Sequence, residues 1–233
     1  MNKEVFVEEL RRLGIIITED QLNKLEIYYN FLIEYNKNVN LTRIVDKDEV
    51  YLKHFYDSLT LIKAIDLNKE LNLCDVGTGA GFPGMVLSIV FPTLSVTLVD
   101  ALQKRITFLD LVINKLGLKN VKTVHARIED YAKDNREKYD IVTCRAVSNL
   151  RVLLEISIPL VKVDGFFIPM KGFIETELEE ALDMFKKLDC EILTTIDFTL
   201  PIENSTRTLI KIKKNKETNH KYPRRYDLIK KEA

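Results

Sequence analysis

Asp75 opens a short segment, "DVGTGAGFPG", in which residue types and spacing predict a binding site. Half of the chain's eight glycines lie in it: Gly77, Gly79, Gly81 and Gly84. Glycine lets a backbone turn tightly and approach a ligand closely, because no side chain intervenes. An apolar run, "LNLC", comes directly before the aspartate. The segment therefore predicts a ligand-binding turn at the end of a strand.

The glycine spacing fits two classes of adenosine-containing ligand. Gly79, Gly81 and Gly84 match the GxGxxG pattern of dinucleotide-binding proteins. Counted from Asp75, the same segment matches DxGxGxG, the pattern of S-adenosylmethionine-dependent methyltransferases. Asp100, at the end of the second apolar run, serves both hypotheses, because an acid there can accept hydrogen bonds from ribose hydroxyls.

Three features favour the methyl donor. Asp75 stands where a dinucleotide fold usually has an apolar residue, and its carboxylate can orient the turn and face a cationic amino group. Pro83 falls where a pyrophosphate needs backbone N–H groups, and proline has none. The hairpin-like end of the chain's strand pattern also suits a methyltransferase. The turn's predicted donor contacts are Asp75, Gly77, Thr78, Gly79 and Gly81. An NAD(P)-dependent oxidoreductase and a non-catalytic adenosyl- or RNA-binding protein stay as alternatives.

Five apolar runs alternate with helical stretches from Leu71 onward: "LNLCDVG", "SVTLVDA", "VKTVHA", "YDIVTCRA" and "GFFIPMKG". This alternation predicts a parallel sheet covered by helices on both faces. Two further runs, "CEILTTIDFTL" and "TRTLIKIKK", have little helix between them and predict a hairpin-like edge. The predicted fold class is α/β, a class I (Rossmann-like) methyltransferase with a seven-stranded, mostly parallel sheet and one antiparallel strand.

The beginning and end of the chain differ from this middle part. Residues 3 to 65 read as helical, with a capping-box pattern at Thr18 and Gln21. From Thr206 onward, ten Lys/Arg face three acids, although the whole chain is neutral. We predict an N-terminal helical cap over 1–65, a methyltransferase domain over 66–215 and a basic C-terminal tail over 216–233. The tail is either a polyanion contact or a solvated, partly disordered end.

Ligands of an open α/β sheet bind at the carboxyl ends of its parallel strands. Ala101 follows the second strand, and Ile128 and Glu129 follow the third. Glu129 can accept the adenine amino group while Ile128 packs on the ring. A helix cap is the alternative role for Asp100, and a solvated first-turn acid is the alternative for Glu129.

Arg145 follows the fourth strand and is the predicted catalytic residue. Its guanidinium could bind the donor's carboxylate, a base oxygen or an rRNA phosphate, and a structural ion pair is the alternative. The chain lacks the Asn/Asp/Ser-Pro-Pro-aromatic segment of exocyclic-amine methyltransferases. Cys144 has no nearby acid to assist pyrimidine chemistry, so we predict a buried thiol. Guanine N7 would need no general base, because it carries a free lone pair, and positioning would suffice.

Polyanion contacts are expected in a few places. Lys53, His54 and Asp57 lie within one helical turn and predict a polar cluster facing the cleft. The RNA-binding candidates are Lys53, His54, Lys171, Arg207, Lys221, Arg224 and Arg225. No apolar run approaches a membrane span, and no secretory signal is recognisable. Three scattered cysteines and three histidines predict reduced thiols, no metal site and a cytoplasmic protein.

The chain resembles the RsmG (GidB) family of small-subunit rRNA methyltransferases over nearly its whole length. The segments that carry the resemblance include "NVNLTRI", "HFYDSL", "GTGAGFPG", "YDIVTCRAV" and "KYPRR". The resemblance implies an enzyme that methylates N7 of one guanine of 16S rRNA, nucleotide 527 in the 530 loop, with naked rRNA or a small-subunit particle as its partner. Nothing in the sequence demands more than a monomer, so we predict one. It also implies donor contacts at Gly77, Phe82, Asp100, Ile128, Glu129 and Arg145. The chain departs from the family at Ala101, where relatives often have serine, and after "KYPRR".

Overall fold

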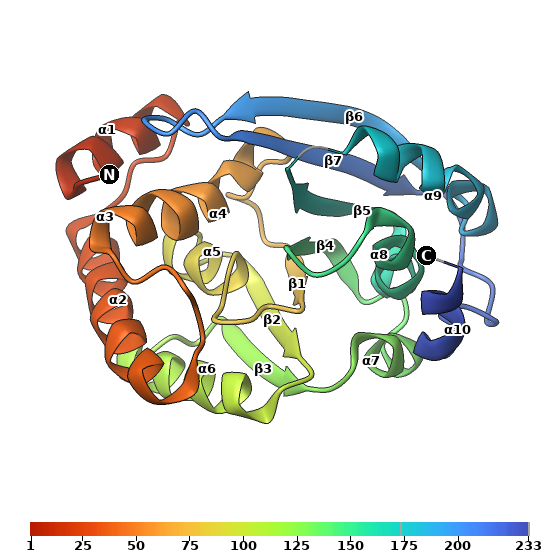
Figure 1. Ribbon diagram of the computed structural model, residues 1–233, viewed down its shortest axis with the longest axis horizontal. Helices are drawn as coiled ribbons and strands as arrows, with labels where there is room; N and C mark the ends of the chain where they lie inside the picture. The colour runs from red at the N-terminus through yellow and green to blue at the C-terminus, as the bar shows by residue number, and fades with distance from the viewer. Residues whose placement is uncertain (173, 233) are drawn as a thin grey trace.

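Seven strands form one sheet in the order β3-β2-β1-β4-β5-β7-β6 (Figure 1). The computed structural model describes residues 1–172 and 174–232. The strands are β1 (Asn72–Val76), β2 (Ser95–Asp100), β3 (Val121–His125), β4 (Tyr139–Arg145), β5 (Val161–Lys171), β6 (Cys190–Thr199) and β7 (Thr206–Lys214). Within the described ranges, β7 is antiparallel to both its neighbours, and the other pairs are parallel. The predicted α/β class, with one antiparallel strand, is confirmed.

Helices cover both faces of the sheet because neighbouring strand residues point to opposite sides. Leu73 packs in one core with the N-terminal helices, and Cys74 packs in the other. The first face is covered by α5 (Gly84–Val90) and α6 (Gln103–Leu116). The second is covered by α7 (Ile128–Asp134), α8 (Leu150–Ser157), α9 (Glu175–Lys187) and α10 (Tyr226–Lys231), beside the short turn η3 (Ile158–Leu160).

The N-terminal helices pack directly against the glycine turn. They are α1 (Lys3–Arg12), α2 (Glu19–Val39), α3 (Lys47–Val50), η1 (Tyr51–Tyr56), α4 (Asp57–Leu59) and η2 (Thr60–Lys63). The predicted capping box at Thr18 begins α2. Tyr28 of α2 donates its hydroxyl to the Ala80 carbonyl and stacks on Phe82 with ring centroids 5.6 Å apart. The cap thus shares a core with the sheet, and a boundary at residue 65 stays a prediction.

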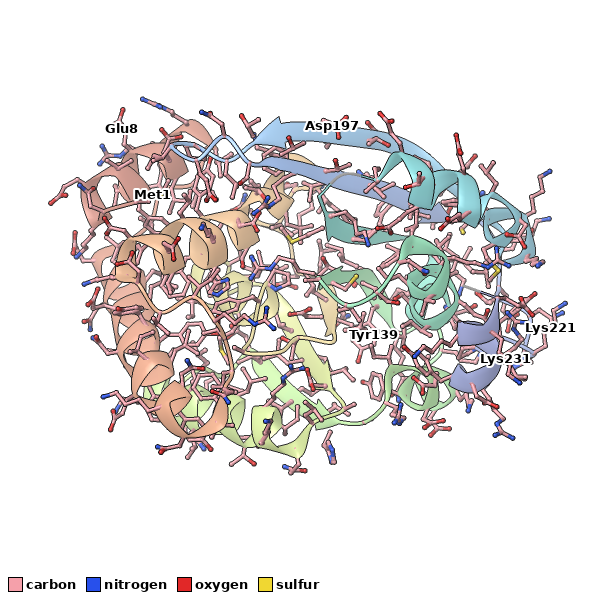
Figure 2. The ribbon with its side chains drawn as sticks, in the orientation of Figure 1. Met1, Glu8, Tyr139, Asp197, Lys221 and Lys231 are labelled. Carbon is pink, nitrogen blue, oxygen red and sulfur yellow. The ribbon has the colours of Figure 1, made fainter. Side chains whose placement is uncertain are left out.

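The C-terminal segment is folded back onto the domain. Tyr222 and Ile229 are 5% and 2% exposed, and the Arg224 guanidinium pairs with Glu155, which is 1% exposed. This packing argues against a solvated tail. Lys221 and Lys231 lie at the opposite end of the molecule from Met1 and Glu8 (Figure 2). A basic surface at this end is therefore separate from the charges of α1.

Candidate functional site

Asp75 holds the glycine turn from within the core. Its Oδ2 accepts hydrogen bonds from the Thr78 hydroxyl at 2.7 Å and the Gly84 amide at 2.8 Å. Its Oδ1 is buried and has no hydrogen-bond partner among the described residues. Burial raises the pKa of Asp75 to about 6, against the two hydrogen bonds, which favour the ionised form. Asp75 therefore braces the turn and lies beneath it.

Glycine is required in this turn by close approach and by backbone conformation. Gly77 has φ of +69°, and a Cβ there would lie 2.7 Å from Cγ2 of Val147, in the loop after β4. Gly79 has φ of +62° and donates its amide to Oδ2 of Asp100 at 2.9 Å. The turn therefore contacts the loop after β4 through Gly77 and is hydrogen-bonded to the end of β2 through Gly79.

A cavity of about 200 Å³ opens beside this turn, at the carboxyl ends of the strands. We call it the glycine cavity. Five predicted donor contacts line it: Gly77, Asp100, Ala101, Ile128 and Glu129. The structure directs Gly81 and Phe82 toward the cap instead, because both pack against Tyr28. Thr78 and Gly79 hold the turn through Asp75 and Asp100.

The glycine cavity combines acids with apolar walls. The Asp100 carboxylate accepts from the Leu102 amide at 2.9 Å and from Arg105 Nη1 at 3.1 Å. Glu129 is buried, and its nearest cation is Arg127 at 3.8 Å. Ile128 and Val147 add apolar surface. Hydrogen-bond acceptors around an apolar slot fit a ribose and a base, so these residues suit an adenosine-containing ligand.

Tyr226 also lines the glycine cavity, and sequence reasoning missed it. It begins α10, seventy residues beyond Ile156, the last of the other lining residues in the chain. Arg224 fixes this position, since its backbone amide, Nε and Nη2 all donate to Glu155 of α8 at 2.8–2.9 Å. The apolar spacing in "YDLIKK" was the available signal for a packed helix. It does not say which surface the helix packs on.

Arg145 faces a second cavity, of about 410 Å³, on the other side of the loop that follows β4. We call it the arginine cavity. Arg145 Nη1 donates to the Lys53 carbonyl at 2.8 Å and to Asp57 Oδ2 at 3.0 Å. Nη2 lies 3.0 Å from His54 Nδ1, and the guanidinium lies over the Phe82 ring at 5.4 Å. Arg145 is outside the lining of the glycine cavity.

Ion pairs fix most of the charges of the arginine cavity. Asp57 is 2% exposed and accepts from both Arg145 and Arg207 Nε, the latter at 3.2 Å. The single negative charge of Asp57 therefore neutralises half of the combined positive charge of the two guanidinium groups. Lys171 Nζ donates to the Ser148 carbonyl at 2.8 Å and pairs with Glu177 at 2.7 Å.

His54 is a neutral ring among these cations. Burial, with the nearby Arg145 charge, lowers the pKa of His54 to about 3. Because Arg145 can only donate, Nδ1 of His54 accepts, and Nε2 carries the proton toward Thr42 Oγ1 at 3.0 Å. The ring stacks on Phe82 with centroids 4.3 Å apart. The predicted cluster of Lys53, His54 and Asp57 does line a cavity.

The RNA-binding candidates separate into two groups. Those in the arginine cavity are Lys53, His54, Lys171 and Arg207. The others lie in the C-terminal segment, where Arg224 pairs with Glu155 and Glu232 and Arg225 pairs with Asp227 at 3.2 Å. Lys221 lies over the ring of Tyr222 at 5.0 Å. Their predicted RNA contacts stay predictions.

The three cysteines are buried and free, and burial raises the pKa of Cys144 well above its usual value. That thiol is therefore a poor nucleophile, in line with the prediction. Within residues 1–172 and 174–232, no group of three or more His, Cys, Asp or Glu side chains could hold a metal ion. No helix in that part of the chain is both long enough and apolar enough to span a membrane.

Comparisons with known proteins identify a family that this chain is similar to. The family model GidB, "rRNA small subunit methyltransferase G", matches residues 21–214. "Ribosomal RNA small subunit methyltransferase G" of Oceanobacillus iheyensis is 47% identical over 100% of this chain and 99% of its own length. The Bacillus subtilis protein of the same name is 46% identical over 97% of this chain and 95% of its own length.

Solved structures share the fold at low sequence identity. TYW2 of M. jannaschii, in complex with AdoMet, aligns with a TM-score of 0.54 at 14% identity, covering 68% of this chain and 76% of that one. TrmN of Thermus thermophilus aligns with a TM-score of 0.54 at 15% identity, covering 67% and 48%. These likenesses support the sheet topology alone.

Proposed function

The chain belongs to the GidB family of small-subunit rRNA methyltransferases, and from this premise we propose that its two cavities hold the methyl donor and the target base. The protein is an S-adenosylmethionine-dependent rRNA methyltransferase. The observation that carries the proposal is the position of the end of β4 and the loop after it, whose residues line both cavities: Arg145 and Ala146 face one, and Val147 and Ser148 face the other. A methyl group passing between donor and base would cross at this loop.

The glycine cavity is proposed to bind the donor. S-adenosylmethionine, when bound, supplies an electrophilic methyl group on a positively charged sulfonium. Asp100 is proposed to accept hydrogen bonds from the ribose, with the half-exposed Arg105 guanidinium giving up its place on that carboxylate. Glu129 and Ile128 are proposed to hold the adenine, the first by hydrogen bonding and the second by packing.

The C-terminal segment is proposed to complete the donor site. Tyr226 lines the glycine cavity together with Ile128 and Val152, and the buried pair of Arg224 with Glu155 fixes its backbone. An aromatic ring anchored in this way can exclude water from one side of a bound base. This role differs from the RNA contact that the basic composition of 216–233 predicts.

The arginine cavity is proposed to bind the target guanine, with N7 as the methyl acceptor. The described side chains that line it offer no free general base. Asp57 and Glu177 are in ion pairs, and His54 accepts from Arg145 through its one lone pair. A nucleophile that carries its own lone pair, such as N7, fits a cavity of this kind. We propose that the methylated base is the one guanine at nucleotide 527, in the 530 loop of 16S rRNA.

Arg145 is proposed to position the base. Two of its five N–H groups are directed to Lys53 and Asp57 and one to His54, so the guanidinium is rigidly held with two donors left. Those donors could bind O6 of guanine while N7 stays free. Fixed donors of this kind also stabilise charge that changes during the reaction.

Mass spectrometric mapping of 16S rRNA tests the proposed acceptor. RNA and small subunits from a strain that lacks this enzyme are incubated with the protein and S-adenosylmethionine. We expect one new N7-methylguanine, in the 530 loop. A methyl group on another atom or at another position would overturn the proposed specificity. The comparison of naked RNA with subunits identifies the substrate, and light scattering tests the predicted monomer.

A further inference from the structure

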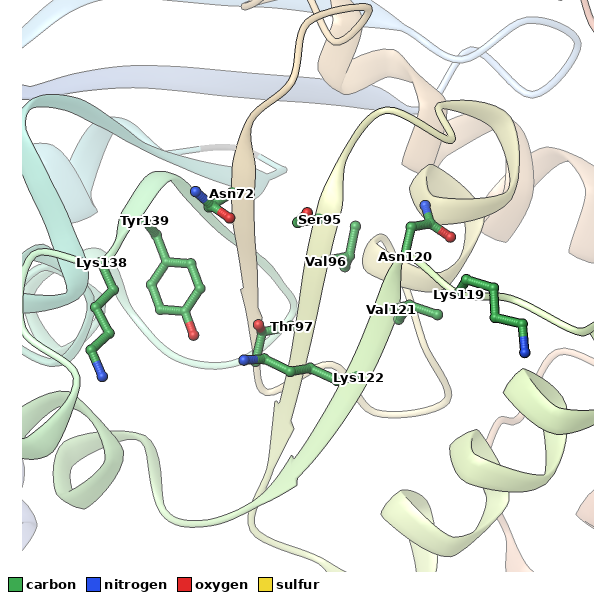
Figure 3. A pocket seen from close by; sticks show the side chains of 10 residues that line it. All are labelled: Asn72, Ser95, Val96, Thr97, Lys119, Asn120, Val121, Lys122, Lys138 and Tyr139. Atoms are coloured by element: carbon green, nitrogen blue, oxygen red, sulfur yellow. The ribbon is translucent and has the colours of Figure 1, made fainter.

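A third cavity, of about 500 Å³, lies at the amino ends of β1 to β4, the end of the sheet opposite to both cavities described above. We call it the lysine cavity. Figure 3 shows Lys138 and Tyr139 on one side and Lys119 on the other, with Thr97 and Lys122 between them. Nothing in the proposed methyl transfer uses these residues.

The floor of the lysine cavity departs from the usual pattern of a parallel sheet. Such a sheet is normally apolar and covered on both faces. Thr97 of β2 and Lys122 of β3 are paired neighbours in the sheet. Farther along the same strands, Val99 and Val124 pack in the core that contains α7 and α8. The short α7 therefore leaves the amino half of this face open, and polar residues occupy the opening.

The charge of the lysine cavity is uncompensated. No carboxylate lines it, and Lys119, Lys122 and Lys138 make no ion pair within the described part of the chain. Asp140, next to Tyr139, is already paired with Lys162 at 2.6 Å and accepts from the Asn72 amide at 2.8 Å. In the arginine cavity, by contrast, Lys53, Lys171 and Arg207 all face carboxylates. Lys138 Nζ donates to Asn135 Oδ1 at 2.9 Å, a neutral partner that leaves the ammonium charge uncompensated. Three ammonium groups without a carboxylate partner around a hollow favour a polyanion.

We propose that the lysine cavity binds phosphates of the rRNA backbone, as a second contact remote from the methylated base. The three lysines are exposed, so each would gain little from one small anion in water. An RNA already held at the arginine cavity presents its phosphates at a high effective concentration, which makes several weak contacts sufficient. Lysine suits this role because it neutralises phosphates without reading sequence. The identity of the polyanion rests on the proposed function, whereas the cavity and its charge do not.

The dimensions allow one RNA to reach both places. The six residues of β2 separate the two ends of the sheet by about 20 Å, at about 3.3 Å per residue. One strand of a duplex advances about 3.4 Å per nucleotide, so about six base pairs cover that distance. The rRNA around a target base is longer than this, and β3 is the edge strand on this side of the sheet.

The test compares two triple variants of the full-length protein. The first replaces Lys119, Lys122 and Lys138 by Gln, and the matched control replaces Lys3, Arg11 and Lys186, which are exposed on α1 and α9, by Gln. Binding of a 530-loop rRNA fragment is measured at several salt concentrations, together with the Kd for S-adenosylmethionine and the thermal midpoint. Lys→Arg variants at the first three positions test whether charge alone restores binding.

We expect the first variant to bind the fragment at least tenfold more weakly at low salt, with a salt slope smaller by about 2 to 3, as for three lost phosphate contacts. Its donor Kd and thermal midpoint should be unchanged, and the Arg variants should bind normally. Equal weakening in both triple variants, or in neither, would overturn the proposal. So would tight binding of inorganic pyrophosphate at these lysines without any effect on RNA, because the site would then serve a free phosphate compound. If the unaltered protein bound rRNA through these lysines but methylated no guanine in it, the proposed function would be contradicted and this contact would stand.

Discussion

The glycine cavity and the arginine cavity lie on two sides of one loop, and they are built in different ways. The glycine cavity is formed mainly by residues that directly follow β1, β2 and β3, so its chemistry lies in short, contiguous motifs. The arginine cavity joins Lys53, Asp57, Arg145, Lys171 and Arg207, from four segments that are far apart in the chain. The first has acids facing its open space, and the second has cations that mostly face acids of the protein. In the proposed assignment, donor binding is therefore a local property of the strand ends, whereas acceptor binding depends on the cap.

The largest effect should come from Asp57, which joins the cap to two arginines. Asp57→Asn leaves Arg145 and Arg207 without their carboxylate, so we expect unfolding free energy to fall by about 3 kcal/mol and methylation to be lost. The matched control is Asp183→Asn, since Asp183 pairs with Arg151 at the surface. Urea unfolding should show a loss of less than about 1 kcal/mol there. Equal losses of unfolding free energy in the two variants would mean that the buried Asp57 contributes no more to stability than a surface ion pair does.

Two variants with opposite effects on donor and RNA binding test whether the two cavities have separate roles. Arg145→Lys removes a planar, multiply bonded guanidinium, and we expect kcat/KM for rRNA to fall about 100-fold with the donor Kd unchanged. Asp100→Asn should instead raise the donor Kd about 30-fold, about 2 kcal/mol for charged hydrogen bonds, with RNA binding unchanged. Calorimetry with S-adenosylmethionine and filter binding with RNA separate the two. A raised donor Kd in Arg145→Lys would restore the predicted contact of Arg145 with the donor.

A smaller effect tests whether the C-terminal segment belongs to the donor site. Tyr226→Ala removes one wall of the glycine cavity, and we expect the donor Kd to rise five- to tenfold, about 1 kcal/mol for a partly buried ring. Tyr226→Phe keeps the ring and should bind the donor normally. RNA binding by both variants should match that of the unaltered protein. If Tyr226→Ala instead weakens RNA binding alone, the segment serves the rRNA, as its charge predicts.

The last effect concerns pH and tests the neutral ring of the arginine cavity. The pKa of His54 is about 3 in the folded protein and about 6.5 when unfolded, so below pH 6.5 the unfolded chain takes up a proton that the native protein does not. His54 therefore contributes stability above pH 6.5 that is lost as the pH falls toward 3. Asp75 acts in the opposite direction, since its raised pKa removes stability as the pH rises from about 4 to 6. We expect His54→Gln to show a weaker loss of unfolding free energy between pH 6.5 and 5, and an unaltered slope would contradict the neutral ring.

The features that could be predicted from the sequence are those that depend on residues close together in the chain. Alternating runs predicted the order of strands and helices, and Gly77, Asp100, Ile128 and Glu129 predicted part of the lining of one cavity. The side to which Arg145 points was not predictable, because it depends on Asp57 and His54, whose approach is decided by packing of the cap. The position of Tyr226 in the glycine cavity was not predictable for the same reason, because the buried ion pair of Arg224 with Glu155 joins segments that are distant in the chain. Composition alone favoured an RNA role for Arg224, which the fold uses to anchor α10.

A crystal structure with S-adenosylhomocysteine tests most directly the claim that donor and acceptor occupy separate cavities. We predict that the compound lies in the glycine cavity, with its ribose on Asp100 and its adenine between Ile128 and Tyr226, while Arg145 keeps its bonds to Asp57 and His54. The account would be contradicted if the compound lay between Lys53 and Arg207, or if Arg145 left Asp57 to bind its carboxylate.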